Sequence, residues 1–178
     1  MHIVPISVDV ETSGAVPSLF NLLQLGACPV LDPDNGFQMD LKPVCAGADP
    51  EALAVTGMTL EHQAEIGEEA SAGMTRFAAW VDAVADGGKP VFVGLAAAYD
   101  WQFVNRYFIE FVGRNPFGFA PIDLKALFMG KTGLPWTECS SSTMDEVLGT
   151  TTRGDHTALG DARYQAELYR LMTAAGAT

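Results

Sequence analysis

Cysteine and histidine are scarce in this sequence, and their scarcity excludes several kinds of site. The three cysteines, Cys28, Cys45 and Cys139, lie far apart and form no Cys-x-x-Cys pair. With only three histidines beside them, too little thiolate and imidazole is present for a zinc site. An odd number of distant cysteines also gives no disulfide framework, so we expect free thiols in a reducing cytoplasm.

Positive charge and long apolar runs are also lacking. Ten Lys and Arg stand against 22 Asp and Glu, and the net charge of −12 argues against a broad grip on duplex nucleic acid. An enzyme that holds only a strand end is compatible with this charge, because bound divalent ions reverse the local sign at a carboxylate cluster. No apolar run is long enough to span a membrane, and no basic segment precedes the first apolar stretch, so neither a membrane segment nor a cleaved signal is expected.

The rest of the composition is that of a globular protein. With 178 residues, 48% of them apolar and 18% charged, we expect one compact domain spanning residues 1–178. Strand-like runs come first and then alternate with helical patterns, which predicts an α/β domain with a mixed central sheet and an antiparallel N-terminal meander. The expected strands are 3–10, 22–31, 37–41, 91–93 and 121–123, and the main expected helices are 68–85, 99–111 and 160–174.

Two further helices have a local start signal. Asp49 followed by Pro50 predicts an N-cap with proline at the first helical position. Thr143 with Glu146 three residues later predicts a capping box and a short helix after it.

The end of the first predicted strand carries two carboxylates. Asp9 and Glu11 are two residues apart, so a strand projects both to the same side, about 7 Å apart along the backbone. Two carboxylates on one rigid face suit hard divalent cations. Taken alone, the pair is equally explained by two solvated side chains at an exposed strand end. The polar, flexible turn that follows, residues 12–14, has backbone N–H groups that can approach a ligand closely.

Three later residues complete a possible metal-assisted hydrolase. Asp100 follows the strand 91–93, at the edge of an α/β sheet where ligands gather, although an aspartate at a helix N-terminus also interacts favourably with the helix dipole. His156 and Asp161 are five residues apart and do not share a helix face. The spacing fits a histidine in a loop, free to reach a water, and an aspartate held in the first turn of the last helix. A further anionic ligand and a proton acceptor are what such a hydrolase needs.

With these five positions in order, the chain resembles the DEDDh branch of the DnaQ-like 3′–5′ exonucleases. Residues 50–58 and 114–117 also resemble stretches of the RNase T and oligoribonuclease side of this family, and the resemblance covers nearly the whole chain. It implies a ribonuclease H-like three-layer fold with helices flanking the mixed sheet. It also implies a metal-dependent nuclease that hydrolyses phosphodiester bonds at the 3′ end of single-stranded DNA or RNA.

The resemblance assigns a role to each position. Four carboxylates hold two Mg²⁺ or Mn²⁺ ions, and His156 is the general base that deprotonates the attacking water. The carboxylates are those of Asp9, Glu11, Asp100 and Asp161. Substrate contacts are expected from Thr12, Ser13 and Gly14 around the terminal nucleotide, and from Tyr99 or Phe103 stacking on a base. Core packing is the simpler explanation of the two aromatic residues.

One departure from the family pattern stands out. Members usually carry His-Asn or a similar polar pair where this chain has Leu95 and Ala96. The amide that helps to hold Asp100 or the substrate is absent, which leaves open weaker activity, altered substrate choice or rescue by another side chain.

Two other functions are compatible with these residues. One is a catalytically weak nucleic-acid-binding module of the same fold, and the other is a phosphodiesterase acting on small nucleotides. The expected partner is a single-stranded 3′ end or a short oligonucleotide, and a homodimer is expected by analogy to the RNase T and oligoribonuclease groups. Candidate phosphate contacts are Lys125, Lys131, Arg153 and Arg163.

Overall fold

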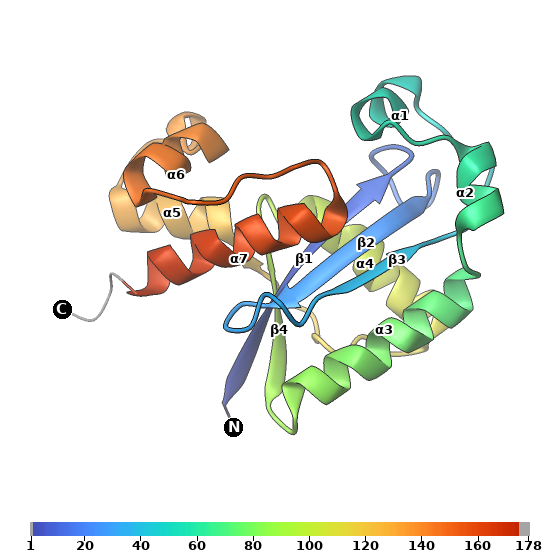
Figure 1. Cartoon of the computed structure of the whole chain (residues 1–178), viewed down its shortest axis with the longest axis horizontal. Coiled ribbons are helices and arrows are strands. Elements are labelled where there is room, and N and C mark those ends of the chain that lie inside the picture. Colours follow the sequence, from blue (N-terminus) through green and yellow to red (C-terminus); the bar gives the residue numbers. More distant parts are fainter. Residues whose placement is uncertain (1, 175–178) are drawn as a thin grey trace.

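A five-stranded mixed sheet forms the centre of the structure, a computed structural model that describes residues 2–174 (Figure 1). The strand order is β3-β2-β1-β4-β5, with β1 in the middle. The first three strands pair antiparallel, and β4 and β5 run parallel to β1. The predicted mixed sheet with an N-terminal meander is therefore confirmed. The strands are β1 (Ile3–Thr12), β2 (Leu22–Pro29), β3 (Phe37–Asp40), β4 (Lys89–Gly94) and β5 (Ile122–Asp123).

Helices cover both faces of this sheet and give three layers. One face packs through Ile6 and Val8 against α3 and α4, in a core rich in aromatic rings such as Phe77. The opposite face packs through Cys28 and Val93 against α5, α6 and α7. The helices are α1 (Pro50–Thr56), α2 (Leu60–Ile66), α3 (Ala70–Ala85), α4 (Ala98–Phe111), α5 (Leu124–Thr132), α6 (Ser141–Leu148) and α7 (Ala158–Ala174), with a short 3₁₀ turn, η1 (Trp136–Glu138).

The local start signals have different outcomes. Asp49 caps α1 as predicted, because its side chain accepts a hydrogen bond from the N–H of Glu51 and Pro50 is the first helical residue. The predicted capping box at Thr143 is wrong. Ser140 is the N-cap of α6, and its hydroxyl accepts from the N–H of Thr143, which already lies inside the helix. None of the helices within residues 2–174 is long and apolar enough to cross a membrane.

A close approach between β2 and α7 brings the last helix to the centre of the sheet. Gly26 pairs with Asp9 across the β1–β2 ladder. A Cβ added to Gly26 would lie 2.1 Å from the carbonyl carbon of Ala158, so only glycine lets the first turn of α7 lie here. In Figure 1, α7 crosses the sheet beside β1 and β2. This crossing places the start of α7 next to Asp9.

Candidate active site

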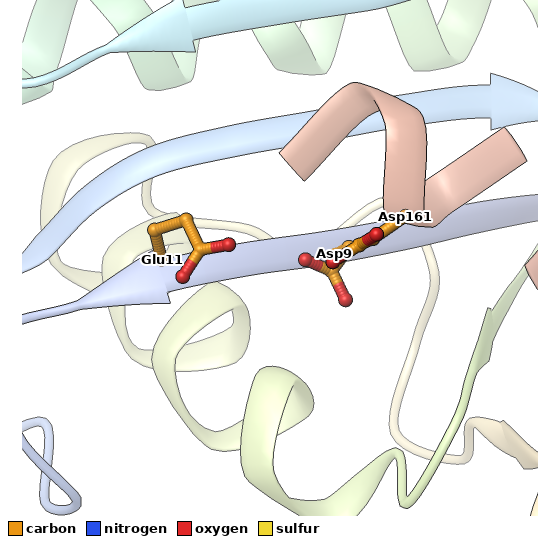
Figure 2. Close-up of side chains that lie close together, drawn as sticks. All are labelled: Asp9, Glu11 and Asp161. Carbon is orange, nitrogen blue, oxygen red and sulfur yellow. The ribbon is translucent and has the colours of Figure 1, made fainter. Parts of the chain in front are cut away.

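Three carboxylates meet where α7 crosses β1. Asp9 and Glu11 project from the same side of the strand, as their spacing predicts, and Asp161 lies in the first turn of α7 (Figure 2). One oxygen from each of the three side chains lies within 4.8 Å of the other two. This separation suits oxygen ligands gathered around hard divalent cations. Figure 2 shows Asp9 and Asp161 side by side and Glu11 further along β1.

Asp100 lies beside this cluster in the first turn of α4 and is almost fully buried. Its Oδ1 accepts a hydrogen bond of 3.1 Å from the N–H of Val10, the residue between the two β1 carboxylates. The bond ties α4 to β1 at the site and uses one of the two carboxylate oxygens. The structure brings the fourth carboxylate next to the other three, and its role as a metal ligand stays a prediction.

The carboxylates are held where their negative charge is unfavourable. Burial, with the nearby charges of Asp100, Glu11 and Asp161, raises the pKa of Asp9 well above its ordinary value. Burial and the charge of Asp161 raise the pKa of Glu11 to about 7. Burial likewise raises the pKa of Asp100 to about 7, and raises that of Asp161. Divalent cations would remove this penalty by compensating the charge, so the residues present fit a metal centre.

His156 lies in the loop before α7, as its spacing predicts. It is exposed, adopts the left-handed conformation at φ 61°, and lines a cavity of about 370 Å³ together with Asp9 and Asp161. The loop closes on the cluster, because the N–H of Asp155 donates to Asp161 Oδ1 at 2.9 Å. At Gly154, an added Cβ would lie 2.4 Å from that same oxygen. The predicted base therefore shares one cavity with two of the four predicted metal ligands, Asp9 and Asp161.

The other end of this loop is fixed by Glu167 on α7. Its carboxylate accepts hydrogen bonds from the backbone N–H and the hydroxyl of both Thr151 and Thr152. Burial alone would raise the pKa of Glu167, but these hydrogen bonds outweigh it and lower the pKa to about 2. The loop is thus pinned at both ends by carboxylates of one helix.

A second cavity, of about 240 Å³, is lined by Glu11, which does not line the larger one. Two of the predicted substrate contacts line it: Thr12 and Tyr99, whose hydroxyl oxygens are 2.7 Å apart. Val55 of α1, 73% exposed, gives the same cavity an apolar wall. An apolar wall beside a pair of hydroxyls and a carboxylate is a suitable place for a base and its sugar.

The other predicted substrate contacts belong to the interior. Phe103 is fully buried, so its ring has no exposed surface for stacking, and the predicted base contact is wrong. The buried Ser13 hydroxyl donates to Gly47 O at 2.7 Å and accepts from Asn21 N–H at 2.8 Å. Gly14 is buried against the ring of Phe20. Ser13 and Gly14 therefore build the turn and line neither cavity, and their contact with the nucleotide stays a prediction.

Among the four basic candidates, Arg153 alone lines the larger cavity. It is 83% exposed and lies 3.7 Å from Asp145, so its guanidinium is loosely held. Lys125 stands over the ring of Trp136, while Lys131 and Arg163 donate to backbone carbonyls.

Sequence reasoning missed Gln165, which also lines the larger cavity and hydrogen-bonds Asp9. A signal for it was available. Gln165 is four residues after Asp161 in a predicted helix, which places the two side chains on one face.

Known proteins match this chain over most of its length. A protein-family model described as an exonuclease, RNase T, matches residues 6–169. The 3′-5′ DNA exonuclease Cap18 of Escherichia coli is 42% identical over 168 residues, which cover 94% of this chain and 90% of that protein.

Solved structures share the fold at low sequence identity. The nuclease domain of 3′hExo, a DEDDh family member bound to rAMP, superposes with a TM-score of 0.76 at 16% identity, covering 97% of this chain and 92% of that one. Exonuclease I of E. coli in complex with a dA16 oligonucleotide superposes with a TM-score of 0.72 at 17% identity, covering 97% of this chain and 41% of that one. These likenesses confirm the predicted ribonuclease H-like fold.

Proposed function

Because the chain belongs to the RNase T exonuclease family and is a metal-dependent 3′–5′ exonuclease, we propose that its substrate is the 3′ end of single-stranded DNA. The observation that carries the proposal is the cluster of Asp9, Glu11 and Asp161, two of which, Asp9 and Asp161, line a cavity together with His156. The name of the 42% identical relative supports DNA as the polymer. The fold shared with an oligonucleotide-bound exonuclease supports a single strand.

The three clustered carboxylates, with Asp100 beside them, would hold two Mg²⁺ or Mn²⁺ ions. Hard ions prefer this all-oxygen donor set, and no thiolate or imidazole belongs to the cluster within residues 2–174. When bound, such ions activate a water and stabilise the charge on the leaving oxygen. The protein's own contribution is to fix Asp9 and Glu11 on the central strand and Asp161 on a helix packed against it.

His156 would act as the general base. Its exposed position in the loop lets it reach a water at the cluster, and its side chain lines the same cavity as Asp9 and Asp161. The water's oxygen then bonds to the terminal phosphate as the bond to the preceding 3′ oxygen breaks. The products are a nucleoside 5′-monophosphate and a strand one nucleotide shorter.

The cavity beside Glu11 would receive the terminal nucleotide. Val55 and Ala52 offer an apolar surface to the base, and the hydroxyls of Thr12 and Tyr99 can bond the sugar. Arg153, which lines the larger cavity, would contact a phosphate of the remaining strand. Within residues 2–174, no Lys and no other Arg lines either of these two cavities, so bound metal would compensate the rest of the phosphate charge.

A homodimer is part of the proposal and rests on the RNase T resemblance. Sedimentation of the purified protein tests it: a mass near twice that of the chain is expected, and a single-chain mass at high concentration contradicts it.

A labelled strand tests the activity directly. Single-stranded DNA and RNA of one sequence, labelled at the 5′ end, carry either a free or a blocked 3′ end and are incubated with Mn²⁺ or with EDTA. We expect a ladder that shortens from the free 3′ end of DNA and disappears with EDTA. The ladder should also disappear with Asp9→Ala, while Asp32→Ala, which changes an exposed aspartate, should leave it intact.

Other outcomes distinguish the alternatives. Strands that are bound but left intact under every divalent ion would favour a binding module of the same fold. A preference for dinucleotides over longer strands would favour a small-nucleotide phosphodiesterase, and faster shortening of RNA would overturn the proposed polymer.

A further inference from the structure

The side-chain amide of Gln165 joins two parts of the site that the chain itself keeps far apart. Its Nε2 donates to Asp9 Oδ1 at 2.6 Å, and its Oε1 accepts from the backbone N–H of Leu95 at 3.0 Å. Gln165 is 3% exposed, so both hydrogen bonds are sheltered from water. One buried group thus contacts a β1 carboxylate and the segment that leads from β4 into α4.

The chemistry of the two partners fixes the orientation of this amide. A backbone N–H can only donate, so it must face the oxygen of Gln165, and the N–H₂ is then left for the carboxylate of Asp9. In the reverse orientation, the N–H₂ of Gln165 would face the N–H of Leu95, and its carbonyl oxygen would face the carboxylate of Asp9. Neither pair can form a hydrogen bond. A carboxylate that receives a donor on one oxygen is held in one rotamer and keeps its other oxygen free.

The segment from Leu95 to Ala97 needs such support. Ala96 adopts φ 53°, a left-handed conformation unfavourable for alanine, and neither Leu95 nor Ala96 has a polar side chain. On either side of Ala96, side chains from other elements hold the backbone: Gln165 bonds Leu95 N–H, and Asp123 accepts from Ala97 N–H at 2.7 Å. This segment begins α4, which carries Asp100.

We propose that Gln165 is a positioning residue that orients the Asp9 carboxylate toward the metal and couples it to the loop before Asp100. The inference rests on the metal centre proposed above. Hydrogen bonds from outside the ligand set orient metal-binding side chains, and losing one typically weakens metal binding or activity by about 10–100-fold. Gln165 touches neither substrate nor reacting atoms in this role, so its effect passes through Asp9.

Calorimetric titration of Mn²⁺ into Gln165→Met tests the proposal without relying on turnover. Methionine keeps the length and volume of the side chain and removes both hydrogen bonds. We expect about 10–100-fold weaker Mn²⁺ binding, a matching rise in the Mn²⁺ concentration for half-maximal activity, and an unchanged KM for the oligonucleotide. The matched control is Gln63→Met, which alters another buried glutamine, on α2 and away from the cluster, and should leave Mn²⁺ binding unchanged.

A second variant keeps the proposal testable if Gln165→Met does not fold. Gln165→Asn retains the amide but is one methylene too short to reach both partners, so it should also weaken Mn²⁺ binding, and circular dichroism checks that it is folded. Wild-type affinity in either folded variant would overturn the positioning role while leaving the metal centre intact. Absence of Mn²⁺ binding by the wild-type protein would instead overturn the metal centre itself.

Discussion

The candidate active site has two halves that are built in opposite ways. One is the metal seat, formed by Asp9, Glu11, Asp100 and Asp161, and the other is the loop that carries His156. The carboxylates of Asp9 and Glu11 stand on the central strand of the sheet, and Asp100 is buried and bonded to the backbone between them. His156, by contrast, lies in an exposed loop, residues 149–157, without helix or strand. A metal seat requires ligands at fixed separations, whereas a base requires access to water, and each half has the rigidity that its proposed task needs.

The electrostatics of the two halves differ in the same way. Burial raises the pKa of Glu11 and that of Asp100 to about 7, so the charged form of both side chains is unfavourable until a cation binds. The loop anchor Glu167 has its pKa lowered to about 2, because hydrogen-bond donors meet its charge inside the protein. The seat therefore depends on an external ion for its stability, and the loop depends only on the chain.

The largest effect is expected from Asp9→Asn, which removes charge from the seat and keeps the size of the side chain. Activity should fall by roughly 10³-fold or more, since a metal contributes several kcal/mol to the transition state. The metal-free variant should nevertheless melt at a higher temperature than wild type, because a buried charge is gone. Differential scanning calorimetry with EDTA and with Mn²⁺ checks this, and a lower melting temperature would show that the seat is not under strain.

A smaller loss is expected from His156→Asn, which changes the loop half. Removing the general base should lower kcat by roughly 10²-fold or more. Asparagine tolerates the left-handed conformation of this position, so the loop should keep its path. Mn²⁺ affinity and melting temperature should equal those of wild type. If Mn²⁺ binding falls along with kcat, the two halves are not separable.

The two halves should also respond to pH with opposite sign. In the metal-free protein, Glu11 and Asp100 have folded pKa values of about 7 and ordinary values of 4.5 and 3.8, so their contribution to stability is lost as pH rises through this window. Glu167 contributes above its ordinary value of 4.5, and its contribution is lost as pH falls toward 2. Mn²⁺ should raise the melting temperature more at about pH 7.5 than at about pH 5.5, because protons compete for the ligands. An equal rise at both pH values would contradict the assignment.

Glu167→Gln weakens the anchor of the loop and leaves the proposed base, His156, unchanged. An amide offers one acceptor oxygen where the carboxylate offers two, so Thr151 or Thr152 loses its partner. We expect the free energy of unfolding to fall by about 1–3 kcal/mol, measured by urea titration, with a modest loss of kcat. Glu65→Gln, on an exposed face of α2, is the matched control and should change neither.

The sequence predicts the strand and the helix that carry the carboxylates better than it predicts the contacts around them. Alternation of apolar and polar residues marks β1, and the spacing from His156 to Asp161 predicts the start of α7 within two residues. The strand period alone then places Asp9 and Glu11 on one side. These features are local, and each is written in a few consecutive residues.

What sequence reasoning missed depends on contacts between distant parts of the chain. Phe103 and Tyr99 look alike as aromatic residues of one helix, yet one is in the core and the other is 40% exposed, which only tertiary packing decides. The bond between Gln165 and Asp9 joins residues 156 positions apart. The short helix α2, capped by Thr59, was missed because its sequence is mostly polar and has no buried apolar residue.

The smallest effect concerns backbone strain near each half: Ala96, in the segment that leads to Asp100, has φ 53°, and His156, in the loop, has φ 61°. Strained backbone of this kind persists at functional sites when the surrounding contacts hold it.

Ala96 is exposed and asparagine adopts this conformation more readily, so Ala96→Asn should raise the free energy of unfolding by about 0.5–1 kcal/mol. The control Ala98→Asn, at an exposed helical position of α4, should be neutral or slightly destabilising, because asparagine is a poorer helix former than alanine. Urea titration of both variants checks the pair. If Ala96→Asn gains no stability, the bonds from Gln165 and Asp123 already hold the segment without strain.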